Sequence, residues 1–520
     1  FICILILIII HYKYSWQYPL RSDLLQLSKT YFISPDPIIS KAEEIAKLLP
    51  SLPYDYWKRH KDYEMFYKNF SCAPLPDIYN LKFNNMYWQA FKTSNVTFQI
   101  YKAFFDNRKL NGLRNSVHVL AMIDQIDLTT ETFCQFWFEG RTEPVIVGTV
   151  MYKYIWNHEW GDPDAEKYVT YLITCQLPDT HQYESPACVS LIRKPCDTAT
   201  NFLKVTHEVP TKKEDFAVCV KGLDFLKSDK SAKIVEWIEF LDLMGVHKVF
   251  FYQLNVHPNI KKVLDYYVSV GKVDITPLML PEGQPNIPIL QHEFLERHIA
   301  QQYYDELIPY NDCFYRNIYS YEYIVPLDID EIILPVKDKN WISLLKRVQA
   351  NDEASRDVWA SYNVQNVYFL SDLTPAGSHP EIPQYMHMLR HTQRSVNFTR
   401  PYYFVKSFFD TRTVLTVHNH MPLEHANTTK RSYPIDKHDA QLNHYRDNCS
   451  PELDCGPFRK HVVEDKILWR NKDVLMRRFN KICCRSFANM KGVCSKPCVG
   501  SATVKARSPK LVHIGIAHRY

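Results

Sequence analysis

The segment from residue 213 onward alternates short apolar runs with runs of helical periodicity, and this alternation constrains the fold more than any other feature of the chain. The expected strands span residues 216–220, 248–252, 273–275 and 323–327. The expected helices span residues 231–244, 260–268 and 291–307. A strand–helix–strand–helix order predicts a mostly parallel, doubly wound α/β sheet over residues 213–447. Binding sites in such sheets lie at the carboxyl ends of the strands.

The chain before residue 213 has a different pattern. Residues 89–212 hold β-branched and aromatic runs separated by polar or glycine clusters. The expected strands span residues 97–104, 116–123, 132–138, 145–155 and 168–175. They predict a β-rich, sandwich-like domain, which either binds sugar or only packs against its neighbour. Residues 15–88 are interrupted by prolines and are interpreted as a stem, with one short helix over residues 38–49.

The chain starts with an apolar run, residues 1–10, and its first residue is Phe1 rather than Met. The run is too short to cross a bilayer by itself. Tyr12, Tyr14 and Trp16 follow it, as aromatic residues do at a membrane interface. Residues 1–14 are therefore predicted to be a truncated membrane anchor or signal remnant, and a buried strand is the alternative.

Cysteines and glycosylation sequons indicate the secretory pathway. The chain has 14 cysteines and no Cys-x-x-Cys pair, which argues against a zinc ribbon. Five Asn-x-Ser/Thr sequons begin at Asn69, Asn95, Asn397, Asn427 and Asn448. In the C-terminal extension, residues 448–520, the pairs Cys449/Cys455 and Cys494/Cys498 have spacings that suit local disulfides. With the N-terminal run, these signals predict a type II membrane protein of the endoplasmic reticulum or Golgi.

Charge and composition exclude other classes of protein. The chain is 46% apolar and 23% charged, as globular proteins are, which excludes a disordered or collagen-like chain. The net charge is +5, from 62 basic and 57 acidic residues, without a Lys/Arg block. A nucleic-acid partner is therefore not expected.

The residues with the clearest chemistry lie in the stretch from Tyr323 to Pro335, where an apolar strand runs into Asp328-Ile329-Asp330. In extended chain, side chains two residues apart point to the same side. Two carboxylates at the carboxyl end of a strand suit Mn²⁺ or Mg²⁺ and leave positions for diphosphate oxygens. The alternative is a carboxylate pair that caps the next element. A second Asp-x-Asp at residues 162–164 lacks a preceding strand and is interpreted as a turn.

Two histidine patterns carry less information. His292 and His298, beside Glu293, are six residues apart rather than four, so they fall on different faces of a helix and do not form a zinc-protease motif. The triplet at residues 418–420, His-Asn-His, resembles a nuclease motif but is too short to indicate one.

Several blocks, in order, resemble glycosyltransferase family 92. The resemblance extends over about residues 90–480 and depends on five blocks: residues 219–223 (CVKGL), 237–252 (WIEFL to MGVHKVFFY), 311–316 (NDCFYR), 328–331 (DIDE) and 444–446 (HYR). An ordered set of blocks is more specific than an isolated Asp-x-Asp.

The resemblance implies a GT-A fold, type II Golgi topology, use of Mn²⁺ and transfer of a sugar, mostly galactose from UDP-galactose, with inversion onto a glycan. It implies that Asp328 and Asp330 bind the metal and that His444 is a third ligand, with a packed or surface histidine as the alternative. It also implies that Asp312 and Arg316 contact the donor, with a helix-terminus salt bridge as the alternative.

The resemblance also bears on donor and mechanism. The turn expected at Lys221-Gly222 differs from the small or proline-containing turn common in the family, and it should lie near the nucleotide. A single displacement needs a base for the acceptor hydroxyl, and Glu331, Asp436 and Asp439 are candidates. Two other functions compete with an active transferase: a catalytically silent, glycan-binding member and a metal-dependent phosphohydrolase.

Overall fold

The computed structural model describes residues 41–62, 72–160, 167–352, 357–375, 377–447 and 456–486. The chain divides into two compact units, residues 1–50 and 51–520. In the first unit the described residues form α2 (Lys41–Leu48), within the helix expected over residues 38–49. Within the described residues, we find no helix with the length and apolar character needed to cross a membrane. The predicted anchor (residues 1–14), Asn69, Asn448, the Asp-x-Asp at residues 162–164 and the predicted C-terminal cysteine pairs lie outside the described residues.

The N-terminal part of the second unit is a nine-stranded sheet in the order β5-β4-β8-β9-β2-β3-β7-β6, with β1 paired to β2. Its strands are β1 (Gln89–Lys92), β2 (Thr97–Asp106), β3 (Ser116–Ile123), β4 (Phe133–Trp137), β5 (Val145–Gly148), β6 (Met151–Tyr154), β7 (Val169–Gln176), β8 (Cys188–Ile192) and β9 (Leu203–Thr206). The single strand expected over residues 145–155 is divided into β5 and β6, which lie at the two opposite edges of this sheet.

The nine-stranded sheet folds back on itself. Cys134 of β4 and Cys175 of β7 form a disulfide, although four strands lie between β4 and β7 in the sheet. The sandwich-like arrangement is thus formed by one folded sheet rather than by two separate sheets. Part of the span interpreted as a stem packs on it: Tyr56 of α3 (Tyr54–His60) donates to the Phe138 carbonyl at 3.0 Å, and Cys72 is disulfide-bonded to Cys196.

The C-terminal part contains a seven-stranded sheet in the order β12-β11-β10-β13-β18-β15-β21. Its strands are β10 (Glu214–Phe225), β11 (Val246–Val256), β12 (Val273–Pro277), β13 (Tyr321–Pro326), β15 (Ser361–Val364), β18 (Lys406–Asp410) and β21 (Tyr433–Ile435). β12, β11, β10 and β13 are parallel, and β18 is antiparallel to both of its neighbours. This agrees with the mostly parallel sheet expected from the alternation of strands and helices.

Smaller sheets and helices complete this part. The three-stranded sheet has β22 (Ala440–Arg446) between β14 (Glu331–Pro335) and β16 (Asn366–Leu370). Two-stranded pairs join β17 (Gln393–Ser395) to β23 (Val462–Glu464) and β19 (Val414–Val417) to β20 (Pro422–His425). The α-helices are α5 (Ser231–Met244), α6 (Pro258–Ser269), α7 (Pro288–Arg297), α8 (Ile299–Asn317), α9 (Trp341–Asp352), α10 (His387–Arg390), α11 (Gly456–Lys460) and α12 (Lys472–Ser486).

The single helix expected over residues 291–307 is wrong in two respects. The chain breaks at His298 into α7 and α8, and α8 then continues through Pro309 to Asn317. Proline normally ends or kinks a helix because it has no N–H to donate. Most of α8 is buried, and the free energy gained by packing it against two sheets outweighs the cost of Pro309.

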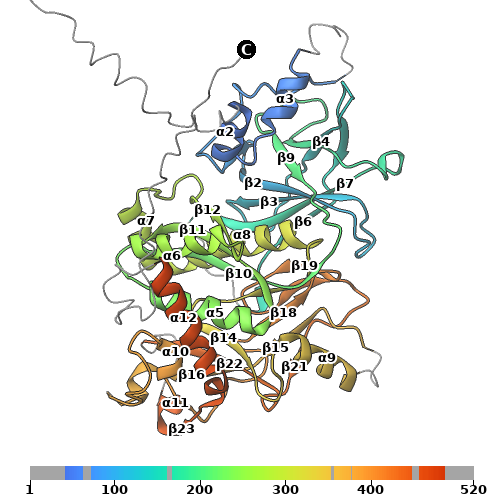
Figure 1. The fold of residues 1–520 in the computed structure, drawn as a ribbon. Coiled ribbons are helices and arrows are strands. Elements are labelled where there is room, and N and C mark those ends of the chain that lie inside the picture. The colour runs from blue at the N-terminus through green and yellow to red at the C-terminus, as the bar shows by residue number, and fades with distance from the viewer. Residues whose placement is uncertain are drawn as a thin grey trace, which may run out of the picture. The chain divides into compact units, whose positions relative to one another are not determined.

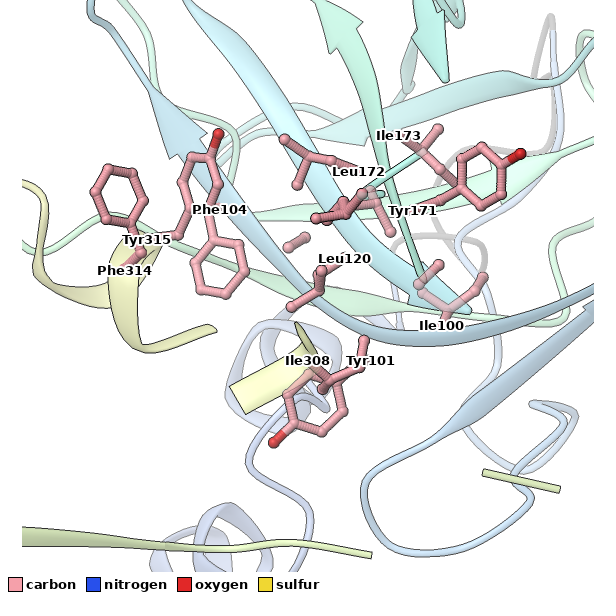
Figure 2. Close-up of a cluster of buried hydrophobic side chains, with 14 of the residues drawn as sticks. Ile100, Tyr101, Phe104, Leu120, Tyr171, Leu172, Ile173, Ile308, Phe314 and Tyr315 are labelled. Atoms are coloured by element: carbon pink, nitrogen blue, oxygen red, sulfur yellow. The ribbon is translucent and has the colours of Figure 1, made fainter. Parts of the chain in front are cut away.

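α8 lies between the two large sheets and contacts β10 on one side and β2, β3 and β7 on the other (Figure 1). Successive residues of β10 face opposite sides, so Ala217 and Cys219 pack into the core shared with α8, whereas Val218 packs into the core beneath α5 and α6. Figure 2 shows Tyr315 of α8 beside Phe104 of β2, and their rings stack at 5.4 Å between centroids. A disulfide joins Cys219 of β10 to Cys313 of α8.

Glu236 is a buried carboxylate on α5 that holds the start of α10. Its two oxygens accept hydrogen bonds from the backbone N–H groups of Met388 (2.9 Å) and Leu389 (3.1 Å). Burial raises the pKa of Glu236 from 4.5 to about 7, although these N–H groups partly offset the effect. Between these two pKa values the folded state binds more protons than the unfolded state.

We therefore expect Glu236 to favour folding most below pH 4.5, and this contribution to be lost as the pH rises through about 7. The free energy of unfolding of the wild type, minus that of Glu236→Gln, should fall between pH 5 and pH 8 by roughly 2–3 kcal/mol. Denaturant unfolding with the disulfides intact measures this difference. Glu293→Gln, a half-exposed carboxylate on α7, is the matched control. An equal difference at both pH values would contradict the assignment.

Candidate active site

A cavity of about 430 Å³ lies at the carboxyl ends of β10 and β13. The chain runs from β10 to β11 and β12 on one side and then crosses to β13 on the other, so these two strands flank the point where the strand order reverses. Open α/β sheets bind ligands at such points. The polar side chains that line the cavity are Lys221, Lys230, Lys233, Tyr303, Asp328, Asp330, Glu331, Asn366, Tyr368, Asn419, His420, His444, Tyr445, Arg446 and Asp447.

The acidic segment at residues 328–331 is a turn, which corrects the extended chain expected there. The Glu331 N–H donates to the Asp328 carbonyl at 3.1 Å, and the Asp330 carbonyl accepts from the Tyr445 N–H at 2.8 Å. The turn forms because β13 and β14 belong to different sheets. Asp328 and Asp330 both line the cavity, although not by the alternation of an extended strand.

Lys406, the first residue of β18, supplies a buried cation to this turn. Its side chain is fully buried, and its Nζ lies 3.1 Å from Asp328 Oδ2 and 3.0 Å from Glu331 Oε2. Burial lowers the pKa of Lys406, but the two carboxylates raise it above its usual range. Burial raises the pKa of Asp328, yet Lys221 and Lys406 hold it well below its usual range. The cation therefore compensates two carboxylates that would otherwise be costly to bury.

Lys221 reaches the cavity from within β10. The turn expected at Lys221-Gly222 is wrong, because β10 continues to Phe225 with a bulge at this position. A bulge redirects the side chains of a strand. Lys221 Nζ lies 2.7 Å from Glu306 of α8 and 3.8 Å from Asp328. Gly222 packs closely against β11, since a Cβ there would lie 3.0 Å from the Leu254 side chain.

His444 joins the acidic turn to the three-stranded sheet. It is the cross-strand partner of Glu331 on β14 and of Tyr368 on β16. Its Nε2 lies 3.5 Å from Asp330 Oδ2 and its Nδ1 lies 3.4 Å from Glu331 Oε1. Burial lowers the pKa of His444, but Glu331 and Asp330 outweigh this and raise it. The histidine that the resemblance implies as a third ligand therefore lies beside Asp330.

The start of α5 brings positive charge to another side of the cavity. Lys230 precedes the helix and Lys233 lies in its first turn, and both pair with Asp447, at 3.3 and 3.0 Å. Unpaired N–H groups and the helix dipole make such a terminus favourable for anions. The cavity therefore presents carboxylates from the turn at residues 328–331 and cations from β10 and α5.

The structure does not bring four other expected residues to the cavity. Asp312 is fully buried in α8 between the large sheets, bound by Lys102 at 2.9 Å and by the Tyr252 hydroxyl at 2.6 Å. Arg316 of the same helix donates to Thr276 at 2.7 Å. Asp312 and Arg316 were expected to contact the donor, but both belong to a polar network inside the protein instead.

Asp436 and Asp439 lie at the opposite end of β22 from His444, about 15 Å away along the strand. Asp439 pairs there with Lys337 at 2.7 Å and with Arg347 at 3.2 Å. Of the three candidate bases, Glu331 alone lines the cavity, and it is only 3% exposed.

Several residues of the site were not found by sequence reasoning: Lys406, which is buried behind the acidic turn, and Asn419 and His420, which line the cavity. Lys406 stands in the apolar run VKSFF, and a lone lysine in such a run is a usable signal for a buried ion pair. Asn419 and His420 belong to the triplet set aside as too short to indicate a function. His420 donates from Nδ1 to the Val405 carbonyl at 2.9 Å, and burial together with Lys406 lowers the pKa of its ring to about 3. The neutral ring then presents a lone pair at Nε2.

A divalent metal needs several ligand side chains that converge on one point. Within the described ranges no three His, Cys, Asp or Glu side chains are gathered around one point where an ion could bind. Asp328, Asp330 and His444 line the same cavity, and the two carboxylates supply the oxygen ligands that a hard cation prefers. Asp328 Oδ1 is buried and has no hydrogen-bond partner among the described residues.

The comparison with protein families decides the assignment. A sequence model described as Glycosyltransferase family 92 matches residues 214–479, just over half of the chain. The chain belongs to glycosyltransferase family 92. The match covers the seven-stranded sheet, the acidic turn and His444.

Individual relatives are more distant. The Caenorhabditis elegans protein named beta-1,4-galactosyltransferase galt-1 is 25% identical over 248 residues, which are 45% of this chain and 51% of that protein. This chain thus spans about half the length of the curated relative. Two solved structures of S. aureus TarS 1–349, one in complex with UDP-GlcNAc, share 11% and 14% identity at a TM-score of 0.24. They cover 45% and 53% of this chain and 60% and 73% of TarS 1–349, and a likeness this weak carries no argument.

We expect Lys406→Met to lower the free energy of unfolding by about 3 kcal/mol, because it leaves Asp328 and Glu331 without their buried cation. Lys337→Met is the control: its ion pair with Asp439 is on the surface, with the lysine 59% exposed, so its loss should cost about 1 kcal/mol or less. Denaturant unfolding at neutral pH measures both. Equal losses in the two variants would show that Lys406 does not stabilise the acidic turn.

Proposed function

We propose that the chain transfers a sugar, most simply galactose from UDP-galactose, onto a glycan acceptor with inversion at the anomeric carbon. The observation that carries the proposal is the cavity at the carboxyl ends of β10 and β13, in which the Asp328–Glu331 turn faces a set of cations. Membership of glycosyltransferase family 92 supports sugar transfer, and the name of the nematode relative supports galactose. The parallel order β12-β11-β10-β13 supports a GT-A type of nucleotide-binding sheet.

In this proposal the donor diphosphate lies between the acidic turn and the cations. Lys221 from the β10 bulge and Lys230 and Lys233 at the start of α5 hold its oxygens. Lys230 and Lys233 already pair with the half-exposed carboxylate of Asp447, so they are arranged to bind an anion. Positively charged groups that stabilise the leaving diphosphate lower the barrier to transfer.

We propose that Asp328, Asp330 and His444 hold Mn²⁺ or Mg²⁺. Such an ion, when bound, neutralises charge on the departing nucleotide. The protein's own contribution is to keep Asp328 ionised beside Lys221 and Lys406, and Asp330 ionised beside His444, in a turn fixed by the Tyr445 N–H. Glu331 pairs with Lys406 and His444, and its side chain is only 3% exposed. This burial suits a residue that positions the turn better than a base that must reach the hydroxyl of a bound acceptor.

We also propose that the chain works in the lumen of the endoplasmic reticulum or Golgi. Asn95, Asn397 and Asn427 are exposed, as glycosylation requires. Three disulfides join described cysteines, which is typical of an oxidising compartment.

Asp330→Asn tests the metal and donor assignment. Its side chain is 38% exposed, so the variant should unfold at nearly the wild-type temperature. The transfer rate from UDP-galactose with Mn²⁺ should fall roughly 100-fold, because the carboxylate that binds the ion is lost. Asp265→Asn, on the exposed surface of α6, is the control and should keep full activity. Full activity of Asp330→Asn, or wild-type activity that persists in EDTA, would overturn the metal assignment.

A donor screen separates the competing functions. We expect transfer from one UDP-sugar to a glycan, measured as UDP release that depends on the acceptor. Glycan binding without turnover of any donor would instead indicate a catalytically silent member. Phosphate release from simple phosphate esters would indicate a phosphohydrolase.

A further inference from the structure

A group of aromatic rings from three distant segments lies at the edge of the cavity. We call it the aromatic shelf, and it consists of Trp156, Trp160, Tyr303, Phe404, His418 and His420. Trp160 lies 4.9 Å from His418, His418 lies 5.6 Å from His420, and His420 lies 6.1 Å from Phe404, all between ring centroids. Trp156 contacts Trp160 at 5.9 Å and stacks on Tyr303 at 6.3 Å.

The shelf is continuous with the cavity and open to solvent. Tyr303, Phe404 and His420 are themselves part of the cavity lining. Trp160 is 43% exposed and Phe404 is 48% exposed, although large aromatic side chains are usually well buried. An aromatic surface that opens into a polar cavity is the usual composition of a site for an organic ligand.

The backbone beneath the shelf is held in an unfavourable conformation. Phe404 has φ 55° and Tyr402 has φ 69°, values that bulky residues seldom adopt. Two hydrogen bonds fix this loop: Thr399 Oγ1 donates to the Tyr403 carbonyl at 2.9 Å, and His420 Nδ1 donates to the Val405 carbonyl at 2.9 Å. Strain of this kind costs about 1–3 kcal/mol per residue and persists mostly at functional sites.

The polar groups of the shelf suit a molecule that has both a flat apolar face and hydroxyl groups. With Nδ1 donating to Val405, the neutral His420 ring can accept at Nε2 a hydrogen bond that a hydroxyl group donates. His418 is 8% exposed, and its Nδ1 has no hydrogen-bond partner in the described part of the chain, so ring contacts hold it in place. A pyranose ring has this combination: an apolar face of C–H groups and a rim of hydroxyls.

We propose that the acceptor glycan binds on the aromatic shelf, with the sugar ring that carries the reacting hydroxyl stacked on Trp160 and that hydroxyl directed towards the cavity. This inference rests on the proposed function, and it names the place and chemistry of the second substrate. Trp156 and Trp160 follow β6 of the nine-stranded sheet, whereas Phe404 directly precedes Val405 and Lys406. The nine-stranded sheet therefore takes part in acceptor selection as well as packing.

Trp160→Ala tests the proposal by kinetics. With UDP-galactose as donor, the probe is the methyl glycoside that accepts galactose fastest, chosen from a panel of hexosides, N-acetylhexosaminides and fucosides. Loss of one stacking face should raise the acceptor KM roughly tenfold, with a smaller change in the donor KM. Tyr183→Ala, which removes a ring that is 93% exposed and outside the cavity lining, should leave both values unchanged. Equal acceptor KM values for wild type and Trp160→Ala would overturn the shelf and leave sugar transfer standing.

A binding measurement keeps the test independent of turnover. Saturation-transfer NMR of the same methyl glycosides, with saturation of the protein's aromatic protons, should give signals in the wild type and in Tyr183→Ala. The signals should be lost or strongly reduced in Trp160→Ala, whose folding is checked by thermal unfolding. If no donor is turned over, this pattern still supports the shelf while the transferase proposal fails. Signals that survive in Trp160→Ala, or their absence from the wild type, would overturn the shelf.

Discussion

The burial of α8 between two large sheets is the constraint on which the rest of the architecture depends. One side of the helix packs on β10 and the other on β2, β3 and β7, so neither sheet can shift without disturbing the helix. The same helix carries groups that reach the cavity: Glu306 binds Lys221, the Tyr310 hydroxyl binds Asn419, and Tyr303 lines the wall. The element that joins the sheets is thus also the element that fixes the cavity.

The carboxylates of the acidic turn are each paired with a basic side chain, so Asp328 and Asp330 are not an isolated pair of acidic residues. Asp328 faces Lys406 and Lys221, Asp330 faces His444, and Glu331 faces both Lys406 and His444. Unpaired buried carboxylates would be protonated or would destabilise the fold. Because cationic partners outweigh the effect of burial on the pKa of Asp328 and Asp330, these two carboxylates can stay ionised at the end of a buried strand. If an anionic donor and a metal ion bind in this cavity, the donor would pair with the cations and the metal ion with the carboxylates, in place of the ion pairs that these side chains make with each other.

Local signals made much of the fold predictable from sequence. The helix expected over residues 231–244 is α5 residue for residue, because its periodicity is clear and Gly245 follows in the left-handed conformation that ends helices. The strand expected over residues 116–123 is likewise β3. α8 was not predictable, since Pro309 is a local signal to stop and only packing against two sheets overrides it.

Without the family resemblance, which named the distant His444, the site was predictable only where its residues are contiguous. Asp328 and Asp330 were found from one short segment, but the backbone between them depends on β14 pairing with a strand more than a hundred residues later. Lys406 lies 78 residues from its partner Asp328, and no sequence pattern joins the two. Asp312 and Arg316 had the residue types of donor contacts, yet burial in α8 directs them to Lys102 and Thr276.

The disulfide between Cys219 and Cys313 has a consequence for biosynthesis. It joins residues 94 apart, two positions before Lys221 on one side and seven after Glu306 on the other. The bond can form only after β10 and α8 have met, so oxidation covalently secures an arrangement that packing has already selected. A chain made where thiols stay reduced would have to hold Lys221 against Glu306 by non-covalent contacts alone. The redox state of the host is therefore a practical condition for obtaining this protein with its cavity intact.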